Sequence, residues 1–366
     1  MAQQHLETTG AEGCAGEVVA AYLREQATEF LRSLRQHRES GGAAPGGTAE
    51  EAADAARALR RSARRISGTL HTFRPLLDAE WSDALRPELA WLSGTLAQEH
   101  AYAGRLERLL SALHRLSGAH MLPGQASVAT ALPAVGSRSA GAERLGTAQL
   151  PRNENRASGN LTVGAAKAGA LLERQLTLAR TRAHSTALQA LGSSRFHAVA
   201  DNVAVLASEV PLRATTADLD ALTASARSRL AEAVTALPLH RAGHPYNAEA
   251  LVQGLTADTA PPSQDAPWHH VRLLLRLHRY AQEVVPAGPG TGGGPADAET
   301  EAAAALDRHR DAAEAAAAAA HAARTPRIAP ATAYALGVLH ADQRHEVEAA
   351  RFAFQRAWLK ETVHTP

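Results

Sequence analysis

One stretch sets the fold class of this chain: Trp268-His269-His270-Val271-Arg272-Leu273-Leu274-Leu275-Arg276-Leu277-His278-Arg279-Tyr280. On a helix at 100° per residue, His269, Arg272, Arg276 and Arg279 fall within one sector about 80° wide. Most of the leucines fall outside it, so the segment predicts a helix with an apolar side and a separate cationic stripe. No acidic residue interrupts the stretch. Because like charges at this spacing destabilise a helix, the stripe predicts a polyanionic ligand.

A second stripe of the same kind occurs in the N-terminal part of the chain. Arg57, Arg60 and Arg64 have the spacing of His269, Arg272 and Arg276, and Arg61 and Arg65 widen the stripe without an acid between them. Two related stripes in distant parts of the sequence predict two similar halves that face a shared basic site.

Composition limits the fold and the compartment. Apolar residues make up 45% of the 366 residues but aromatic residues only 4%, which predicts a core of alanine and leucine between helices. The 38 basic and 37 acidic residues nearly cancel, so only local clustering can attract a polyanion. Nearly all the basic residues are arginines, which suit bidentate phosphate contacts. The single cysteine, Cys14, and the lack of a signal or membrane-spanning pattern predict a cytoplasmic protein.

The periodicity is helical almost throughout, and we expect an all-α fold. Periodicity is lost from Ser117 to Gly164, where Gly, Ser, Ala, Pro and Asn dominate, so the chain divides into helical segments 14–116 and 165–362 around a flexible insertion at 117–164. The expected helices cover 16–37, 48–74, 78–116, 165–191, 194–208, 216–237, 268–285, 297–323 and 330–362.

The residues of both stripes resemble the signatures of the CHAD family, the conserved histidine α-helical domain. His269, Arg272, Arg279 and Tyr280 match the second signature, with Arg276 at a position where the family has lysine. In the first signature the matching residues are Arg57, Arg60, Arg64, Arg65, Ile66, Leu70 and Phe73. The first half departs from the pattern in three places, because Arg57 replaces the family histidine, Ser67 replaces an arginine, and His100-Ala101 replaces an Arg-Asp pair.

This resemblance implies two four-helix bundles related by a pseudo-twofold axis, with a basic groove or pore between them that binds inorganic polyphosphate. It further implies a protein without catalytic activity or cofactor that associates with polyphosphate granules. The expected ligand-binding residues are His269, Arg272, Arg276, Arg279, Tyr280, Arg57, Arg60, Arg61, Arg64 and Arg65. For Tyr280 a packing role is favoured over a phosphate contact. Since an unperturbed histidine titrates near 6.5, we expect binding to strengthen as the pH falls through about 6.5.

Three other functions stay open. A metal-dependent phosphohydrolase would use some of the 18 histidines, but no His-Glu-x-x-His motif occurs, and His340 and His345 do not share a helical face. A nucleic-acid binder is disfavoured by the near-zero net charge and by the lack of aromatic residues interleaved with the arginines. A protein scaffold, with a partner for segment 117–164, and a homo-oligomer both remain possible.

Overall fold

A computed structural model of the chain describes residues 2–41, 49–118, 153–215, 217–243, 252, 262–285 and 295–364. Within these ranges the fold is all-α, as expected, and the only β pairing is an isolated bridge between Leu77 and Leu212. The helices are α1 (Ala2–Gly41), α2 (Ala49–Thr72), η1 (Arg74–Leu76), α3 (Ala79–Leu116), α4 (Asn153–Leu191), α5 (Ser194–Ser208), α6 (Leu219–Thr235), α7 (Leu239–Ala242), α9 (Pro262–Val284), α10 (Pro295–Ala323) and α11 (Pro330–His364).

Local sequence signals set several helix ends. The side chain of Asp78 accepts a hydrogen bond from the backbone N–H of Trp81 at the start of α3, and Asp218 caps α6 through Ala221 in the same way. Helix α2 ends just before Pro75, as the sequence predicts. Pro87 lies inside α3 without ending it. Thr48, the first residue of the helix expected over 48–74, lies outside the described residues.

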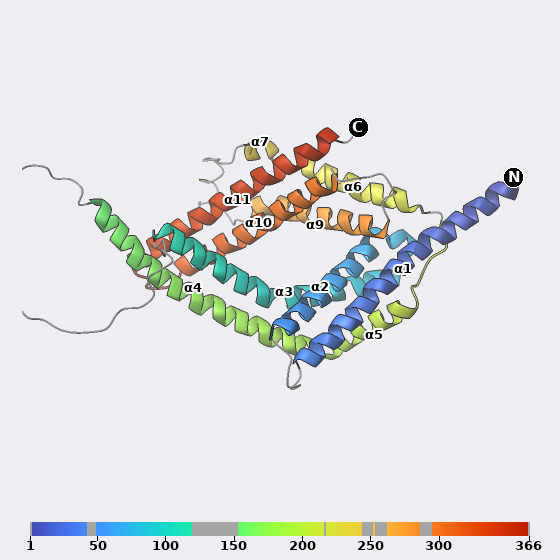
Figure 1. Ribbon diagram of the computed structural model, residues 1–366, viewed down its shortest axis with the longest axis horizontal. Coiled ribbons are helices and arrows are strands. Elements are labelled where there is room, and N and C mark those ends of the chain that lie inside the picture. Colours follow the sequence, from blue (N-terminus) through green and yellow to red (C-terminus); the bar gives the residue numbers. More distant parts are fainter. Residues whose placement is uncertain are drawn as a thin grey trace, which may run out of the picture.

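The first bundle is built from α1, α2, the N-terminal part of α3, and α5. Its core includes Phe30, Leu59, Ile66, Leu89 and Phe196, all without solvent exposure. Helix α5 therefore packs with α1 although it follows α4 in the sequence (Figure 1). The C-terminal end of α9 also reaches this core through Ala281 and Val284.

The second bundle consists of α6, α9, α10 and α11. One core cluster joins Trp268 and Val271 of α9 to Leu306 of α10 and Phe354 of α11. Another cluster packs α4 and the C-terminal part of α3 against α10 and α11, so α4 spans the two bundles along one side (Figure 1). Alanines such as Ala315 and Ala319 let α10 and α11 approach closely, which accords with the predicted alanine-rich core.

The insertion predicted at 117–164 lies mostly outside the described residues, which omit 119–152. Helix α4 begins at Asn153, within the predicted insertion. The division of the chain into 14–116, 117–164 and 165–362 stays a prediction.

Candidate anion-binding site

The two cationic stripes lie on α2 and α9, and these helices contact one another where the bundles meet. The close approach depends on Gly68, because a Cβ there would lie 2.5 Å from Cδ2 of Tyr280. Tyr280 thus packs its ring against the backbone of α2, in keeping with the packing role expected for it. The contact brings the stripe of one bundle against the stripe of the other, as a pseudo-twofold arrangement requires.

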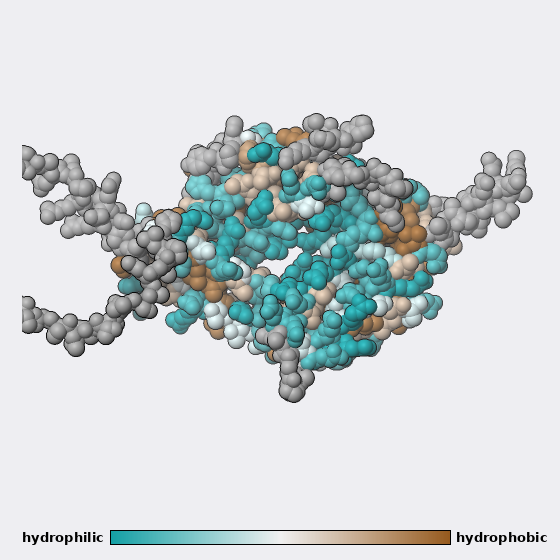
Figure 2. Space-filling model, viewed as in Figure 1, coloured by the Kyte–Doolittle hydropathy of each residue, from teal (hydrophilic) through white to brown (hydrophobic). Residues whose placement is uncertain are grey.

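An opening passes near the middle of the molecule between the bundles, surrounded by hydrophilic residues (Figure 2). A cavity of 210 Å³, here called the α9 cavity, is lined by residues of α2, α9 and α10. Five of the predicted site arginines line it, together with Tyr280 and two carboxylates. Its lining is Arg61, Arg65, Arg272, Leu275, Arg276, Arg279, Tyr280, Glu283, Ala303 and Asp307.

A second cavity of 320 Å³, the α3 cavity, is walled by α3 and α10 and includes one residue of α2, Arg60. Arg105, Arg108 and Arg310 add three cations that the sequence interpretation missed. His100, Asp311 and Glu314 also line it. Arg310 was overlooked because it is flanked in the sequence by Asp307, Asp311 and Glu314, which is typical of a solvated helix face.

Three arginines of α2 and α9 influence one another electrostatically, and we call Arg60, Arg64 and Arg276 the arginine triad. Arg60 lines the α3 cavity and Arg276 lines the α9 cavity. Burial, followed by repulsion from Arg60, lowers the pKa of Arg64 to about 10, and burial with repulsion from Arg272 and Arg64 does the same for Arg276. Burial and the charges of Arg310 and Arg276 also lower the pKa of Arg60. Since repulsion between charges falls with distance, the triad and Arg310 form one concentrated positive cluster.

No member of the triad has a carboxylate within ion-pair distance in the part of the chain that the structure describes. The Nε of Arg60 is buried without a hydrogen-bond partner. An unpaired buried donor on a cation is costly, so this cluster is a suitable place for an anion.

Most of the surrounding arginines are paired with carboxylates, which the two acid-free stretches of sequence did not predict. Arg65 donates to Glu283 at 2.6 and 3.2 Å, and Arg272 donates to Asp307 at 2.5 Å. In the α3 cavity, Arg310 donates to Asp311 at 3.0 and 2.5 Å, and Arg105 donates to Glu314. The acids come from α9 beyond Tyr280 and from α10, so only the tertiary structure brings them to the stripes.

Two departures from the family pattern prove to be neighbours. Arg57, which stands where the family has histidine, has its Nη1 3.1 Å from Nε2 of His100, which stands where the family has arginine. The arginine and the histidine that depart from the pattern therefore lie in contact with each other. Arg57 is also paired with Asp54 and lines neither cavity, so it lies at the edge of the site.

His269 lines neither of these two cavities. Its ring packs edge-to-face on His309 with 5.5 Å between centroids. Burial, with the charges of Arg272 and Arg310, lowers its pKa below 6.5 although Asp265 and Glu314 oppose the shift. His269 therefore takes up its proton at a lower pH than the value of about 6.5 expected from the sequence. This corrects the expected pH at which His269 becomes charged.

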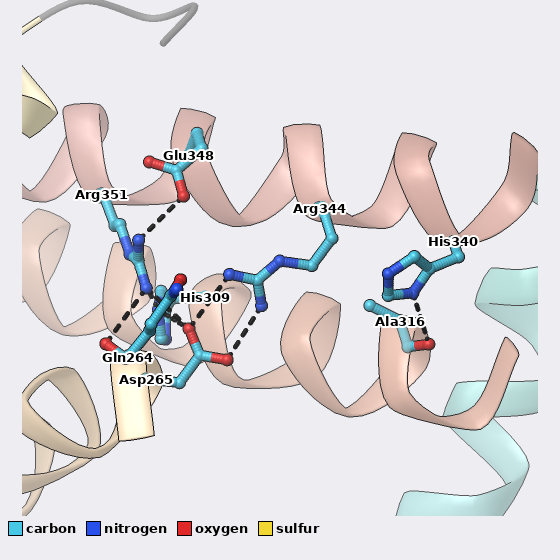
Figure 3. A network of polar contacts seen from close by, with 8 residues as sticks. All are labelled: Gln264, Asp265, His309, Ala316, His340, Arg344, Glu348 and Arg351. Carbon is cyan, nitrogen blue, oxygen red and sulfur yellow. Dashed lines mark hydrogen bonds and ion pairs between the residues drawn. The ribbon is translucent and has the colours of Figure 1, made fainter. Parts of the chain in front are cut away.

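A buried ionic network joins the N-terminal end of α9 to α11 (Figure 3). Arg344 of α11 donates to Asp265 at 2.9 Å, and Arg351 donates to Asp265 at 2.6 Å and to Glu348 at 2.8 Å. Burial alone would raise the pKa of Asp265, but hydrogen bonds from His309 and Arg344 hold it well below its usual range. Burial lowers the pKa of His309 to about 4. The network holds the start of α9, and hence its arginines, against α10 and α11.

A further cavity, of 620 Å³, lies between the C-terminal end of α1 and the start of α2. It contains Glu39, Glu51 and Asp54 but a single arginine, Arg61, so its charge does not suit a polyanion.

Across the described ranges, no three His, Cys, Asp or Glu side chains gather in a way that could hold a metal ion. In those same ranges, every helix is too short or too polar to traverse a lipid bilayer.

The chain is similar to proteins of known structure. The solved structure "PptA from Streptomyces chartreusis" is 60% identical to this chain, covers 94% of it and 99% of its own length, and superimposes with a TM-score of 0.71. The CHAD domain from the plant Ricinus communis is 17% identical, with coverage of 92% and 91% and a TM-score of 0.44. A search of curated proteins gave no match. The profile of the CHAD domain matches residues 25–320, and the chain therefore belongs to the CHAD domain family.

Proposed function

We propose that the chain binds inorganic polyphosphate, without catalysing its turnover, in a groove that runs from the α9 cavity past the arginine triad to the α3 cavity. The observation that supports this most is the triad itself, three partly buried arginines from two helices without a carboxylate partner among the described residues. A protein keeps such mutual repulsion only where something offsets it, and a chain of phosphates supplies one negative charge after another.

The spacing of the cations fits a repeating ligand. Successive arginines on one face of a helix lie about 5–6 Å apart, so α2 and α9 each present several phosphate contacts in a row. Each charge-assisted contact contributes about 1.5–3 kcal/mol. A long flexible anion can engage many of them together, whereas orthophosphate can engage few.

The predicted site residues contribute unequally in this proposal. Arg60, Arg64 and Arg276 bind phosphate at the centre, and Arg61, Arg65, Arg272 and Arg279 extend the contact through the α9 cavity. Arg105, Arg108 and Arg310 extend it through the α3 cavity. His269 and Tyr280 support α9, and Arg57 acts through its contact with His100. We expect the protein to associate with cytoplasmic polyphosphate granules.

The proposal is tested by calorimetric titration with long-chain polyphosphate, orthophosphate and single-stranded DNA. Long-chain polyphosphate is expected to bind most tightly, and the variant Arg60→Ala/Arg64→Ala/Arg276→Ala to bind it at least about 100-fold more weakly. A matched control is Arg74→Ala/Arg86→Ala/Arg195→Ala, which removes three arginines far from the cavities and should bind like the wild type.

Equal affinity for the three ligands, or an unchanged affinity of the triad variant, would refute the proposal. Circular dichroism of both triple variants shows whether helical content is retained. Phosphate release from polyphosphate, followed with and without a chelator, tests the absence of catalysis, and sustained release would assign an enzymatic function instead.

A further inference from the structure

Four carboxylates lie along the groove and bind its outer arginines. Glu283 holds Arg65 and Asp307 holds Arg272 in the α9 cavity. Asp311 holds Arg310, and Glu314 holds Arg105, in the α3 cavity. Asp307, Asp311 and Glu314 follow one another on α10 at i, i+4 and i+7, so they share one face of that helix. The groove therefore has a centre, the triad, without a carboxylate partner among the described residues, and two ends at which Arg65, Arg272, Arg310 and Arg105 already have negative partners.

Asp307, Asp311 and Glu314 are each more exposed than the arginine that they hold. Glu283 and Arg65 are equally exposed, at 34% and 33%, and Glu283 also accepts a hydrogen bond from the Tyr22 hydroxyl at 2.8 Å. The side chain of Asp307 is 56% exposed and that of Arg272 is 17% exposed, and the corresponding values for Glu314 and Arg105 are 39% and 17%. A carboxylate in this position can turn into water at little cost while its arginine stays in the groove. Exposed ion pairs contribute only about 0.2–1 kcal/mol, which a phosphate contact can exceed.

The buried network around Asp265 shows the contrasting case. There the carboxylate is 5% exposed and its arginines, Arg344 and Arg351, are 1% and 8% exposed. Displacing Asp265 would leave charges buried without partners, which costs several kcal/mol. The network around Asp265 therefore stabilises the fold, whereas the ion pairs along the groove are exposed enough for a ligand to replace the carboxylate.

We propose that Asp307, Glu283, Asp311 and Glu314 are internal competitors of the ligand, which occupy the outer arginines in the free protein and are displaced one by one as a phosphate chain extends from the triad. This inference rests on the proposed function and adds a property to it. A short anion meets only the triad and displaces none of the four. A long chain must displace them, so they limit its affinity and keep its binding reversible.

The competition has a defined sign. If Asp307 competes, Asp307→Asn leaves Arg272 free for phosphate and raises the affinity for long-chain polyphosphate by about two- to fivefold, the size expected for removal of one ion pair. Pyrophosphate and orthophosphate, which do not reach Arg272, gain less than about twofold. If Asp307 instead positions Arg272 for the ligand, the same variant binds long chains more weakly.

The experiment measures dissociation constants of Asp307→Asn and Glu283→Gln for orthophosphate, pyrophosphate and long-chain polyphosphate by calorimetry at fixed pH and salt. Glu88→Gln is the matched control, because Glu88 pairs with Arg195 at 2.6 and 3.1 Å away from both cavities. A gain that grows with chain length in both groove variants and is missing in the control supports the proposal. A loss, no change, or an equal gain for all three ligands overturns it.

The two groove variants guard against a folding artefact, since each carboxylate is on a different helix and each replacement keeps its size. Failure of this inference is distinct from failure of the proposed function. If the wild-type protein binds no polyphosphate, the proposed function is refuted. If the wild-type protein binds polyphosphate and the Asp307→Asn variant binds it less tightly, only the proposed competition is refuted.

Discussion

At the scale of the residue, burial and mutual repulsion lower the pKa values of the arginines of the triad, which opposes folding. The pKa of Arg276 is lowered to about 10 in the folded chain by burial and by repulsion from Arg272 and Arg64. A cation whose pKa is lowered by folding destabilises the fold at every pH below the folded value, and stability returns only as the pH rises from about 10 toward the ordinary pKa of arginine. At neutral pH the charge of Arg276 therefore opposes folding, and the same holds for Arg64.

This predicts that Arg276→Met unfolds at a higher temperature than the wild type when no ligand is present. Methionine keeps the length of the side chain and removes both the repulsion and the burial of charge. For a chain of this size we expect a gain of roughly 1–3 °C in Tm, measured by thermal unfolding at pH 7 and low salt. Polyphosphate binding should fall in the same variant. A lower Tm would show that Arg276 stabilises the fold through contacts other than its charge.

At the scale of the element, the spacing of α2 and α9 determines whether their stripes act together. Gly68→Ala would put a Cβ 2.5 Å from the ring of Tyr280, so one helix must shift. Overpacking of this kind costs about 1–3 kcal/mol, and we expect both a lower free energy of unfolding and weaker polyphosphate binding. Urea denaturation and titration of the same sample measure the two effects.

Two further variants isolate that contact. Gly94 in α3 has no atom within 4 Å of an added Cβ, so Gly94→Ala should be neutral or stabilise by about 0.5–1 kcal/mol. In Gly68→Ala/Tyr280→Ala the clash is absent, and the double variant should lose less stability than the sum of its single variants. Additive losses would mean that Gly68 is required for a reason other than Tyr280.

At the scale of the whole molecule, a net charge of +1 gives no general attraction to anions, so affinity must come from the local cluster. Contacts with phosphates release bound counterions, and log K should fall linearly with log salt concentration at about 0.7 per contact for a single-stranded polyanion. We expect a slope of roughly −3 to −5 for long-chain polyphosphate. Arg60→Ala should reduce its magnitude by about 0.7, whereas Arg74→Ala should leave it unchanged. Affinity that does not depend on salt would contradict binding through phosphates.

The helices and the family were accessible from the sequence because both depend on local spacing. Helical periodicity predicted α3, α5, α10 and α11 nearly to their ends, and the stripes predicted Arg61, Arg65, Arg272, Arg276 and Arg279, which line one cavity. The packing of α5 into the first bundle was not predicted, since its apolar face alone does not say which helix it contacts.

By itself the sequence determined that this is an all-α CHAD protein with two arginine stripes, because a helix of given sequence fixes which of its own side chains share a face. Only the tertiary structure decided that Arg310 and Arg105 line the α3 cavity, that Glu283 and Asp307 pair with two arginines of the α9 cavity, and that His269 lines neither cavity. The physical reason is that ion pairing and burial depend on distances between helices, and the spacing of residues within one helix does not determine those distances.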